Sequence, residues 1–340
     1  MTPLLFALIV VMALAMAYMN GFHDASNAVS TTITTRSLKE STALGMAAVL
    51  NLLGAMLGMA VIAVTTSWAV TMLGLGPVVS QLTDRPDALG LALLSLMLAT
   101  FLWDLFTWWV GMPASTWHAF FGATLGVSLV VGSTAAWERL GLLLAISVVG
   151  PILSASFAFV LMVLIRRLTR TERVRPGHLR FAQTLSAGAV ATGHGLNDSL
   201  LPLAVVVIAV GASGLPFSGE ASLALMLPIA IAVAAGTLMG GHRIIRTIGR
   251  RLTDLTATQG LAAETSAAVT MSLALFGLET PVSTSQALAS SVVGAGVARG
   301  PRTVRWKVAR DVLLTWLATP ISSAVLGAAI LGVLLEAVGA

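Results

Sequence analysis

Long apolar runs recur along the whole chain, and they constrain its fold more than any other feature. A helix needs about 20 consecutive apolar residues to cross roughly 30 Å of hydrocarbon. Only 10% of the 340 residues are charged, against about 25% in soluble proteins. We therefore predict an all-α, polytopic membrane protein. The apolar runs lie at 3–20, 41–64, 88–110, 113–131, 140–165, 181–211, 221–240, 260–277, 281–298 and 311–336.

The chain is apolar from its first residues, and no basic leader precedes the first run. We interpret that run as a membrane span and not as a removed signal peptide. The sequence contains no cysteine, which excludes disulfides, thiolate metal sites and cysteine nucleophiles.

The basic residues are concentrated in four short segments between the apolar runs. All of the 19 Lys and Arg residues except Arg85 and Arg139 fall in these segments. Short cytoplasmic loops retain Lys and Arg, so we place all four segments in the cytoplasm. This placement explains the net charge of +5 without a nucleic-acid partner. The segments are 36–39, 166–180, 243–251 and 299–310.

With the basic segments inside, both termini lie outside and each half of the chain has an odd number of crossings. This predicts two inverted repeats, 1–165 and 181–340, joined by a basic cytoplasmic linker at 166–180. If 88–131 and 260–298 are re-entrant hairpins and not pairs of crossing helices, each half loses two crossings and the halves remain inverted. Inverted repeats are typical of secondary transporters, whose site lies at the midplane between the repeats.

A Pro-x-Ser-Thr motif occurs twice, in PASTWH at 113–118 and in PVSTSQ at 281–286. Proline fits the first turn of a helix. The residues after it present free backbone N–H groups and hydroxyls at the positive helix end, which can bind an anion without a cationic side chain. The alternative is ordinary capping and helix–helix hydrogen bonding. His118 and Gln286 either donate to the anion or brace the tips. The predicted anion ligands are Ser115, Thr116, Ser283 and Thr284.

A second duplicated motif is GFHD at 21–24 and GLND at 195–198. Glycine, asparagine and serine weaken a helix, so we expect a broken span at both places. An ionisable residue at membrane depth is a functional-site hypothesis by default. Carboxylate and freed carbonyl oxygens suit Na⁺ or a proton, so Asp24 and Asp198 are predicted cation ligands. The alternative is that they pair with buried hydroxyls or cap helix fragments.

Three further polar residues interrupt apolar segments. Glu264 lies far from both ends of its span, where it either carries a coupling cation or accepts hydrogen bonds from neighbouring Thr or Ser. We expect His194 to be structural. Asp104 lies among tryptophans, which leaves its depth open.

With these motifs in view, the sequence resembles the PiT family of inorganic phosphate transporters over nearly its whole length. The resemblance implies phosphate uptake coupled to Na⁺ or H⁺ and a site between two re-entrant hairpins whose tips carry the Ser-Thr motifs. The similar stretches are GFHDASNAVSTTITTRSL (21–38), GMPASTWHAFFGATLG (111–126), ATGHGLNDSLLPLA (191–204), HRIIRTIGRRLTDLTATQGLAAETSAAV (242–269), TPVSTSQALASSVVGAGVARG (280–300) and VRWKVARDVLLTW (304–316).

The resemblance also implies roles for particular residues. The hairpin-tip residues, with His118 and Gln286, become phosphate ligands. The sequence departs from the family pattern at His23, where Asn is usual, at Gln286, where His is usual, and at Asn51, where some members have Glu. The coupling ion and its stoichiometry therefore stay open. The residues expected to bind or relay the coupling cation are Asp24, Asn27, Asn197, Asp198 and Glu264.

We therefore expect a plasma-membrane symporter with alternating access in the lipid bilayer, without a cofactor besides the coupling ion. A sulfate permease of the same fold is the main alternative, followed by an anion channel or sensor. An intramembrane hydrolase using Ser115 or Ser283 with His118 and Asp24 is disfavoured, because the second motif has Gln in place of the base. We therefore do not expect an enzyme. A homodimer is a further expectation, which no single residue supports.

Overall fold

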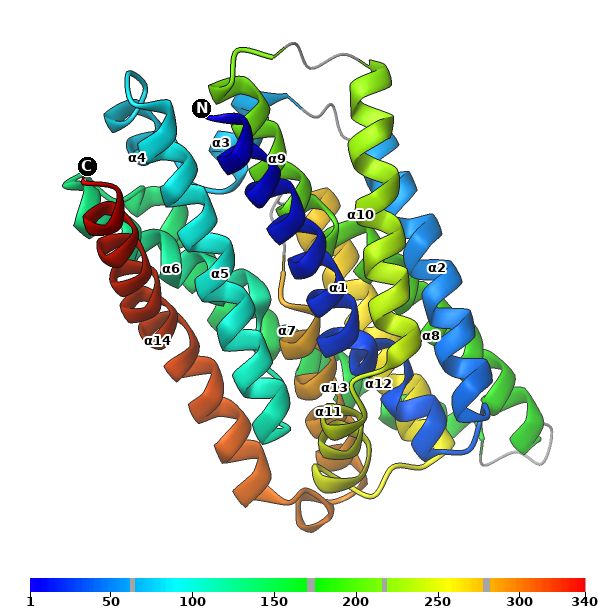
Figure 1. Ribbon diagram of the computed structural model, residues 1–340. Coiled ribbons are helices and arrows are strands. Elements are labelled where there is room, and N and C mark those ends of the chain that lie inside the picture. Colours follow the sequence, from blue (N-terminus) through cyan, green and yellow to red (C-terminus); the bar gives the residue numbers. More distant parts are fainter. Residues whose placement is uncertain (62–64, 170–174, 216–218, 278–281, 340) are drawn as a thin grey trace.

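The computed structural model describes residues 1–61, 65–169, 175–215, 219–277 and 282–339, and these form a bundle of helices (Figure 1). Seven of the described helices are long and apolar enough to cross a membrane, and one bent pair makes an eighth candidate. The only strand-like pairing in these ranges is an isolated bridge between Thr253 and Val304. The prediction of an all-α, polytopic protein is confirmed.

The helices of the first half are α1 (Pro3–Thr34), α2 (Glu40–Val61), α3 (Thr66–Met72), α4 (Gly76–Gln81), α5 (Pro86–Val110), α6 (Thr116–Val131) and α7 (Trp137–Leu168). Those of the second half are α8 (Pro176–Asp198), α9 (Leu200–Ala212), α10 (Gly219–Met239), α11 (His242–Arg246), α12 (Ala257–Ser272), α13 (Thr284–Arg299) and α14 (Trp306–Val338). A π-helical turn, Thr247–Arg251, follows α11.

The expected break at the first Gly-x-x-Asp motif is wrong. Helix α1 continues through residues 21–30 as far as Thr34, and almost every side chain from Met19 to Thr32 is buried. Helix propensity is a weak preference that tertiary packing overrides, and here the polar side chains find partners on neighbouring helices. At the second motif the interruption is a single residue, Ser199 between α8 and α9, which keeps helical backbone angles.

Two segments between the predicted apolar runs contain helices. The segment 66–87 holds α3 and α4. The basic segment 243–251 is largely helical, and with α11 it continues α10 after a bend of 53°. Both changes lie at the ends of membrane-spanning helices and leave the order of the spans unchanged.

The two termini lie at the same end of the bundle, and the described helix ends beside the basic segments lie at the opposite end (Figure 1). Helices α5 and α6 pack together as a hairpin, as do α12 and α13. Helix α5 ends at Gly111, whose φ of 77° is the left-handed conformation that glycine adopts readily. Of the second Pro-x-Ser-Thr motif, Pro281 lies outside the described residues.

Four close helix contacts join the first half of the chain to the second. Helix α1 packs on α10, α8 on α2, α6 on α14, and α13 on α7. At each contact a glycine lets the two helix backbones approach closely. A Cβ atom added to Gly21 would lie 2.0 Å from the carbonyl oxygen of Val233, and one added to Gly195 would lie 2.1 Å from the carbonyl oxygen of Asn51. These contacts bring α1, α8 and the first turns of α6 and α13 together, and most of the chemically interesting polar residues lie there.

Candidate functional site

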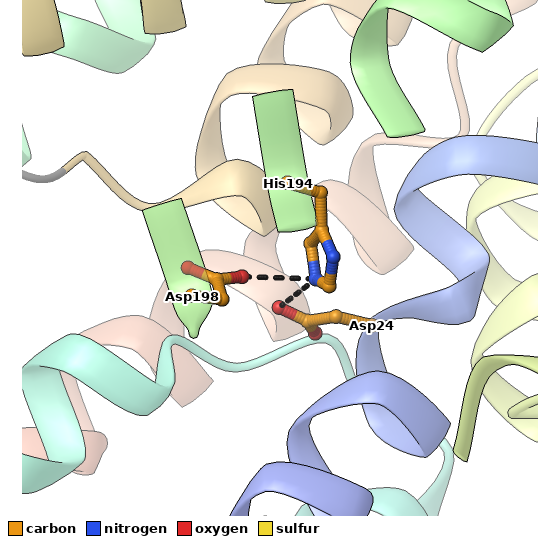
Figure 2. A group of neighbouring side chains, drawn as sticks. All are labelled: Asp24, His194 and Asp198. Carbon is orange, nitrogen blue, oxygen red and sulfur yellow. Dashed lines mark ion pairs between the residues drawn. The ribbon is translucent and has the colours of Figure 1, made fainter. Parts of the chain in front are cut away.

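Asp24 and Asp198, the aspartates of the two duplicated motifs, meet on either side of His194. His194 Nε2 lies 2.9 Å from Asp198 Oδ2 and 3.7 Å from Asp24 Oδ2 (Figure 2). All three residues are buried, and their potential ligand atoms lie within 4.8 Å of one another. Two carboxylates and an imidazole from α1 and α8 thus form one compact charged cluster, which can hold either a protonated imidazole or a cation between the carboxylates.

Asp24 also accepts hydrogen bonds from the start of α13. Thr284 Oγ1 donates to Oδ2 at 3.1 Å and Ser285 Oγ donates to Oδ1 at 3.1 Å. His23 Nδ1 lies 2.7 Å from the same Oδ1. A carboxylate at a helix N-terminus is stabilised by the free N–H groups and the helix dipole. The negative charge of Asp24 therefore holds the second Ser-Thr tip against α1.

Asn27, one turn further along α1, contacts the same two hydroxyl groups. Its Nδ2 lies 2.9 Å from both Thr284 Oγ1 and Ser285 Oγ. The amide donor of Asn27, and not its oxygen, faces these hydroxyls. Each of the two hydroxyls therefore accepts a hydrogen bond from Asn27 and donates one to Asp24, and both partners lie on the same face of α1.

Asp198 has matching contacts with the first tip. Trp117 Nε1 donates to Asp198 Oδ1 at 3.1 Å. Asn197 Nδ2 donates to the same oxygen at 2.5 Å and to the carbonyl oxygen of Val282 at 3.3 Å. The aspartate from each half of the chain is therefore hydrogen-bonded by the hairpin tip of the other half.

Both tip serines cap their helices. Ser115 Oγ accepts from the backbone N–H of His118 at 3.3 Å, and Ser283 Oγ accepts from that of Gln286 at 3.2 Å. Capping was the alternative to anion binding, and the structure shows the capping contacts. Each hydroxyl still has a proton to donate, so an anion contact by these serines stays a prediction.

Glu264 lies apart from this cluster. It accepts a hydrogen bond from Thr31 on α1 and another, of 3.0 Å, from Ser186 on α8. Thr31 is seven residues beyond Asp24, which is about 10 Å along a helix. The expected cation residues therefore divide into the group around Asp24 and Asp198 and a separate group around Glu264, nearer the basic end.

Comparison with known proteins matches residues 20–327 to the phosphate transporter family. The chain belongs to that family. It is 30% identical over 329 residues to a probable low-affinity inorganic phosphate transporter of Bacillus subtilis, with 94% of each chain covered. A relative of the same description from Mycobacterium tuberculosis H37Rv is 35% identical over 337 residues, covering 95% of this chain and 76% of the relative.

A solved structure described as the sodium-dependent phosphate transporter superposes with a TM-score of 0.77 at 21% identity, covering 97% of this chain and 98% of the other. At this identity the likeness shows a shared fold. With its apolar helices, this member of the phosphate transporter family is a multi-pass membrane protein.

The structure places three residues beside the two aspartates that sequence reasoning did not assign to the site of this phosphate transporter family member. Trp117 and Ser285 were not expected to contribute, and His194 was expected to be structural. The duplicated motif holds a signal for the first two, because Trp117 and Ser285 occupy equivalent places and each donates to an aspartate. The i, i+4 spacing of His194 and Asp198 on α8 indicates that these two meet, but nothing in the local sequence indicated the approach of Asp24.

Asn51, one of the departures from the family pattern, lies outside the cluster. Its Nδ2 donates to Thr237 Oγ1 at 2.7 Å, and its backbone carbonyl meets Gly195. In this chain the Asn51 side chain therefore links α2 to α10, and only its backbone lies at the contact between α2 and α8.

Proposed function

We propose that this protein is a plasma-membrane symporter that takes up inorganic phosphate with Na⁺ or H⁺ by alternating access. The relatives, described as inorganic phosphate transporters, support phosphate as the substrate, and the description of the structural neighbour favours sodium. One observation carries the proposal: the first turns of α6 and α13 meet beside the two buried aspartates.

The anion site of this proposal lies between the two tips. Helix N-termini supply positive potential and N–H donors, and the hydroxyls add further donors. In the structure the protons of Thr284 and Ser285 point at Asp24. A cation bound to Asp24 competes for its oxygens and releases these hydroxyls to the anion. The proposed phosphate ligands are Ser115, Thr116, Ser283, Thr284, His118 and Gln286.

Electrostatics makes the cation necessary. Two unit negative charges 4 Å apart repel by about 4 kcal/mol at an effective dielectric constant near 20. A phosphate between the tips faces both Asp24 and Asp198, so it binds weakly until these carboxylates are neutralised. Cation binding before anion binding is therefore the expected order, and it makes the two fluxes interdependent.

The carboxylate oxygens of Asp24 and Asp198 fit Na⁺, which transporters bind with oxygen ligands. Asn27 and Asn197 position them through the contacts described above. His194 lies between the same oxygens, so that a proton on its imidazole and a bound Na⁺ compete for one place. Glu264 forms a second binding position for the cation, nearer the basic end of the bundle.

The packing supports two inverted repeats, 1–165 and 181–340. A Cβ atom added to Gly126 would lie 1.9 Å from the carbonyl oxygen of Ala324. The equivalent contact in the other half joins Gly294 to Ala155, where an added Cβ atom would lie 2.0 Å from the carbonyl oxygen. The partners are exchanged between the halves, as a twofold relation requires. With the linker 166–180 in the cytoplasm, both termini are outside.

The short second helix of each pair supports the two re-entrant hairpins, whereas α5 and the segment Ala257–Gly277 are long enough to cross. Helices α6 and α13 have 16 residues each, short of the about 20 needed to cross hydrocarbon. Their partners, α5 and α12, lead to the tips from opposite ends of the bundle (Figure 1). Helices α7 and α14 are the least buried of the apolar helices and face the lipid bilayer in this arrangement. The expected homodimer would use such a face.

The proposal is tested by uptake of radiolabelled phosphate into proteoliposomes of the purified protein. Accumulation driven by a sodium gradient or by a proton gradient identifies the coupling ion. Suppression by excess sulfate would instead favour a sulfate permease, and equilibration without accumulation would favour a channel. Replacing Ser115 and Ser283 together by alanine is expected to weaken phosphate binding, and unchanged affinity would remove both from the site.

A further inference from the structure

Asp104 is a buried carboxylate that the proposed mechanism leaves unused. It lies on α5, is 1% exposed, and accepts a hydrogen bond at Oδ2 from Thr116 Oγ1 at 2.9 Å. Its Oδ1 has no hydrogen-bond partner in the described part of the chain. No Lys or Arg in the same ranges forms an ion pair with it. A buried ionised group without a partner costs several kcal/mol, so Asp104 either holds a proton or faces a counter-charge.

The nearest imidazole does not supply that charge by direct contact. His23 Nδ1 lies 2.7 Å from Asp24 Oδ1, and its Nε2 lies 3.1 Å from Thr107 Oγ1. Both ring nitrogens of His23 are therefore engaged by groups other than Asp104.

Oxygen atoms from two other helices, α1 and α5, lie around Thr116 on α6. Asn20 Oδ1 on α1 lies 3.3 Å from Thr116 Oγ1. The Nδ2 of Asn20 faces the backbone carbonyl of Asp198 at 3.4 Å, which turns the amide oxygen toward Thr116. A carboxylate, an amide oxygen and a hydroxyl are hard oxygen ligands. With one negative charge among them, they match a monovalent cation.

We propose that Asp104, Asn20 and Thr116 form a further Na⁺ site, separate from the Asp24–Asp198 pair. The inference rests on the proposed function, because Thr116 also belongs to the anion site. A cation here neutralises Asp104 and takes a lone pair of Thr116 Oγ1, so that the hydroxyl proton is freed for the anion. The same relation holds at the other tip, where Thr284 donates to Asp24. Each tip threonine thus donates a hydrogen bond to a carboxylate, and cation binding at that carboxylate frees the threonine hydroxyl.

The test is saturable binding of radioactive sodium to the purified full-length protein without phosphate. Asp104→Asn keeps the size of the side chain and removes its charge. We expect this variant to bind one Na⁺ fewer per chain than the wild type, and to lower the Na⁺ Hill coefficient of phosphate uptake. Asp84→Asn, the same change at an exposed carboxylate, is the matched control and should bind as the wild type does.

Unchanged sodium stoichiometry in Asp104→Asn would overturn the site, as would the lack of saturable sodium binding by the wild type. Asn20→Ala keeps Asp104 in place and covers the case in which Asp104→Asn does not fold. This variant should weaken sodium binding roughly tenfold, as loss of a supporting oxygen does in other metal sites; unchanged affinity would contradict the assignment. A wild type that binds sodium but does not transport phosphate would instead refute the proposed function.

Discussion

Gln286 Nε2 lies 3.5 Å from His118 Nδ1, so the first turns of α13 and α6 meet through residues at equivalent places of the duplicated motif. His118 Nε2 is also hydrogen-bonded to Ser147 on α7. Gln286 Oε1 is buried without a partner in the described ranges. The two tips are therefore in direct contact, and a change at one tip acts on the other.

This contact predicts that His118→Ala and Gln286→Ala do not act independently. In a double-mutant cycle on phosphate affinity, we expect a coupling energy of about 0.5–3 kcal/mol, the range for residues in contact. Equilibrium binding of labelled phosphate to the two single variants and the double variant measures it. Additive effects would mean that the tips do not sense each other.

Ser285 is expected to contribute to transport although sequence reasoning did not select it. Ser285→Ala removes a hydroxyl that bonds to Asp24 here and that the proposed mechanism releases to the anion. A hydrogen bond to a charged group contributes about 1.5–3 kcal/mol. We expect the KM for phosphate uptake to rise about tenfold, which corresponds to about 1.4 kcal/mol. Ser272→Ala is the control, because Ser272 is exposed and bonds only to the carbonyl oxygen of Ala268. Equal KM values for both variants would exclude Ser285 from the site.

The sequence was sufficient to predict most of the spans and to select two aspartates that the structure brings together, and their role as cation ligands stays a prediction. Hydrocarbon demands long apolar helices, and the duplicated Asp24 and Asp198 interrupt such runs. It was not sufficient for the path of α1, which stays helical because its polar side chains bond to other helices. The place of His194 between the aspartates depends on how α8 packs on α1 and α2, and this contact joins residues far apart in the chain.

The glycine of the second motif is expected to set that packing. In Gly195→Ala the added methyl group meets the carbonyl oxygen of Asn51, and overpacking of this kind costs about 1–3 kcal/mol. We expect the variant to lose its monodisperse size-exclusion peak at a lower temperature than the wild type. Gly177→Ala, at the start of the same helix, meets no atom within 4 Å and should be unaffected. Equal thermal stability of the two variants would contradict the close contact.

A variant of Glu264 is expected to affect coupled uptake but not equilibrium binding of phosphate, because the residue is proposed to relay the cation. Glu264→Gln keeps one oxygen for Thr31 or Ser186 and removes the charge. Its partner Thr31 lies about 10 Å along α1 from Asp24. Phosphate binding at equilibrium should therefore stay within about twofold of the wild type, a difference of less than 1 kcal/mol. Coupled uptake into proteoliposomes should fall about tenfold or more, since a tenfold loss requires only about 1.4 kcal/mol in the barrier. Glu138→Gln, at an exposed carboxylate, is the control. A parallel loss of phosphate binding would place Glu264 in the anion site, and unchanged uptake would leave it a purely structural acceptor between α1, α8 and α12.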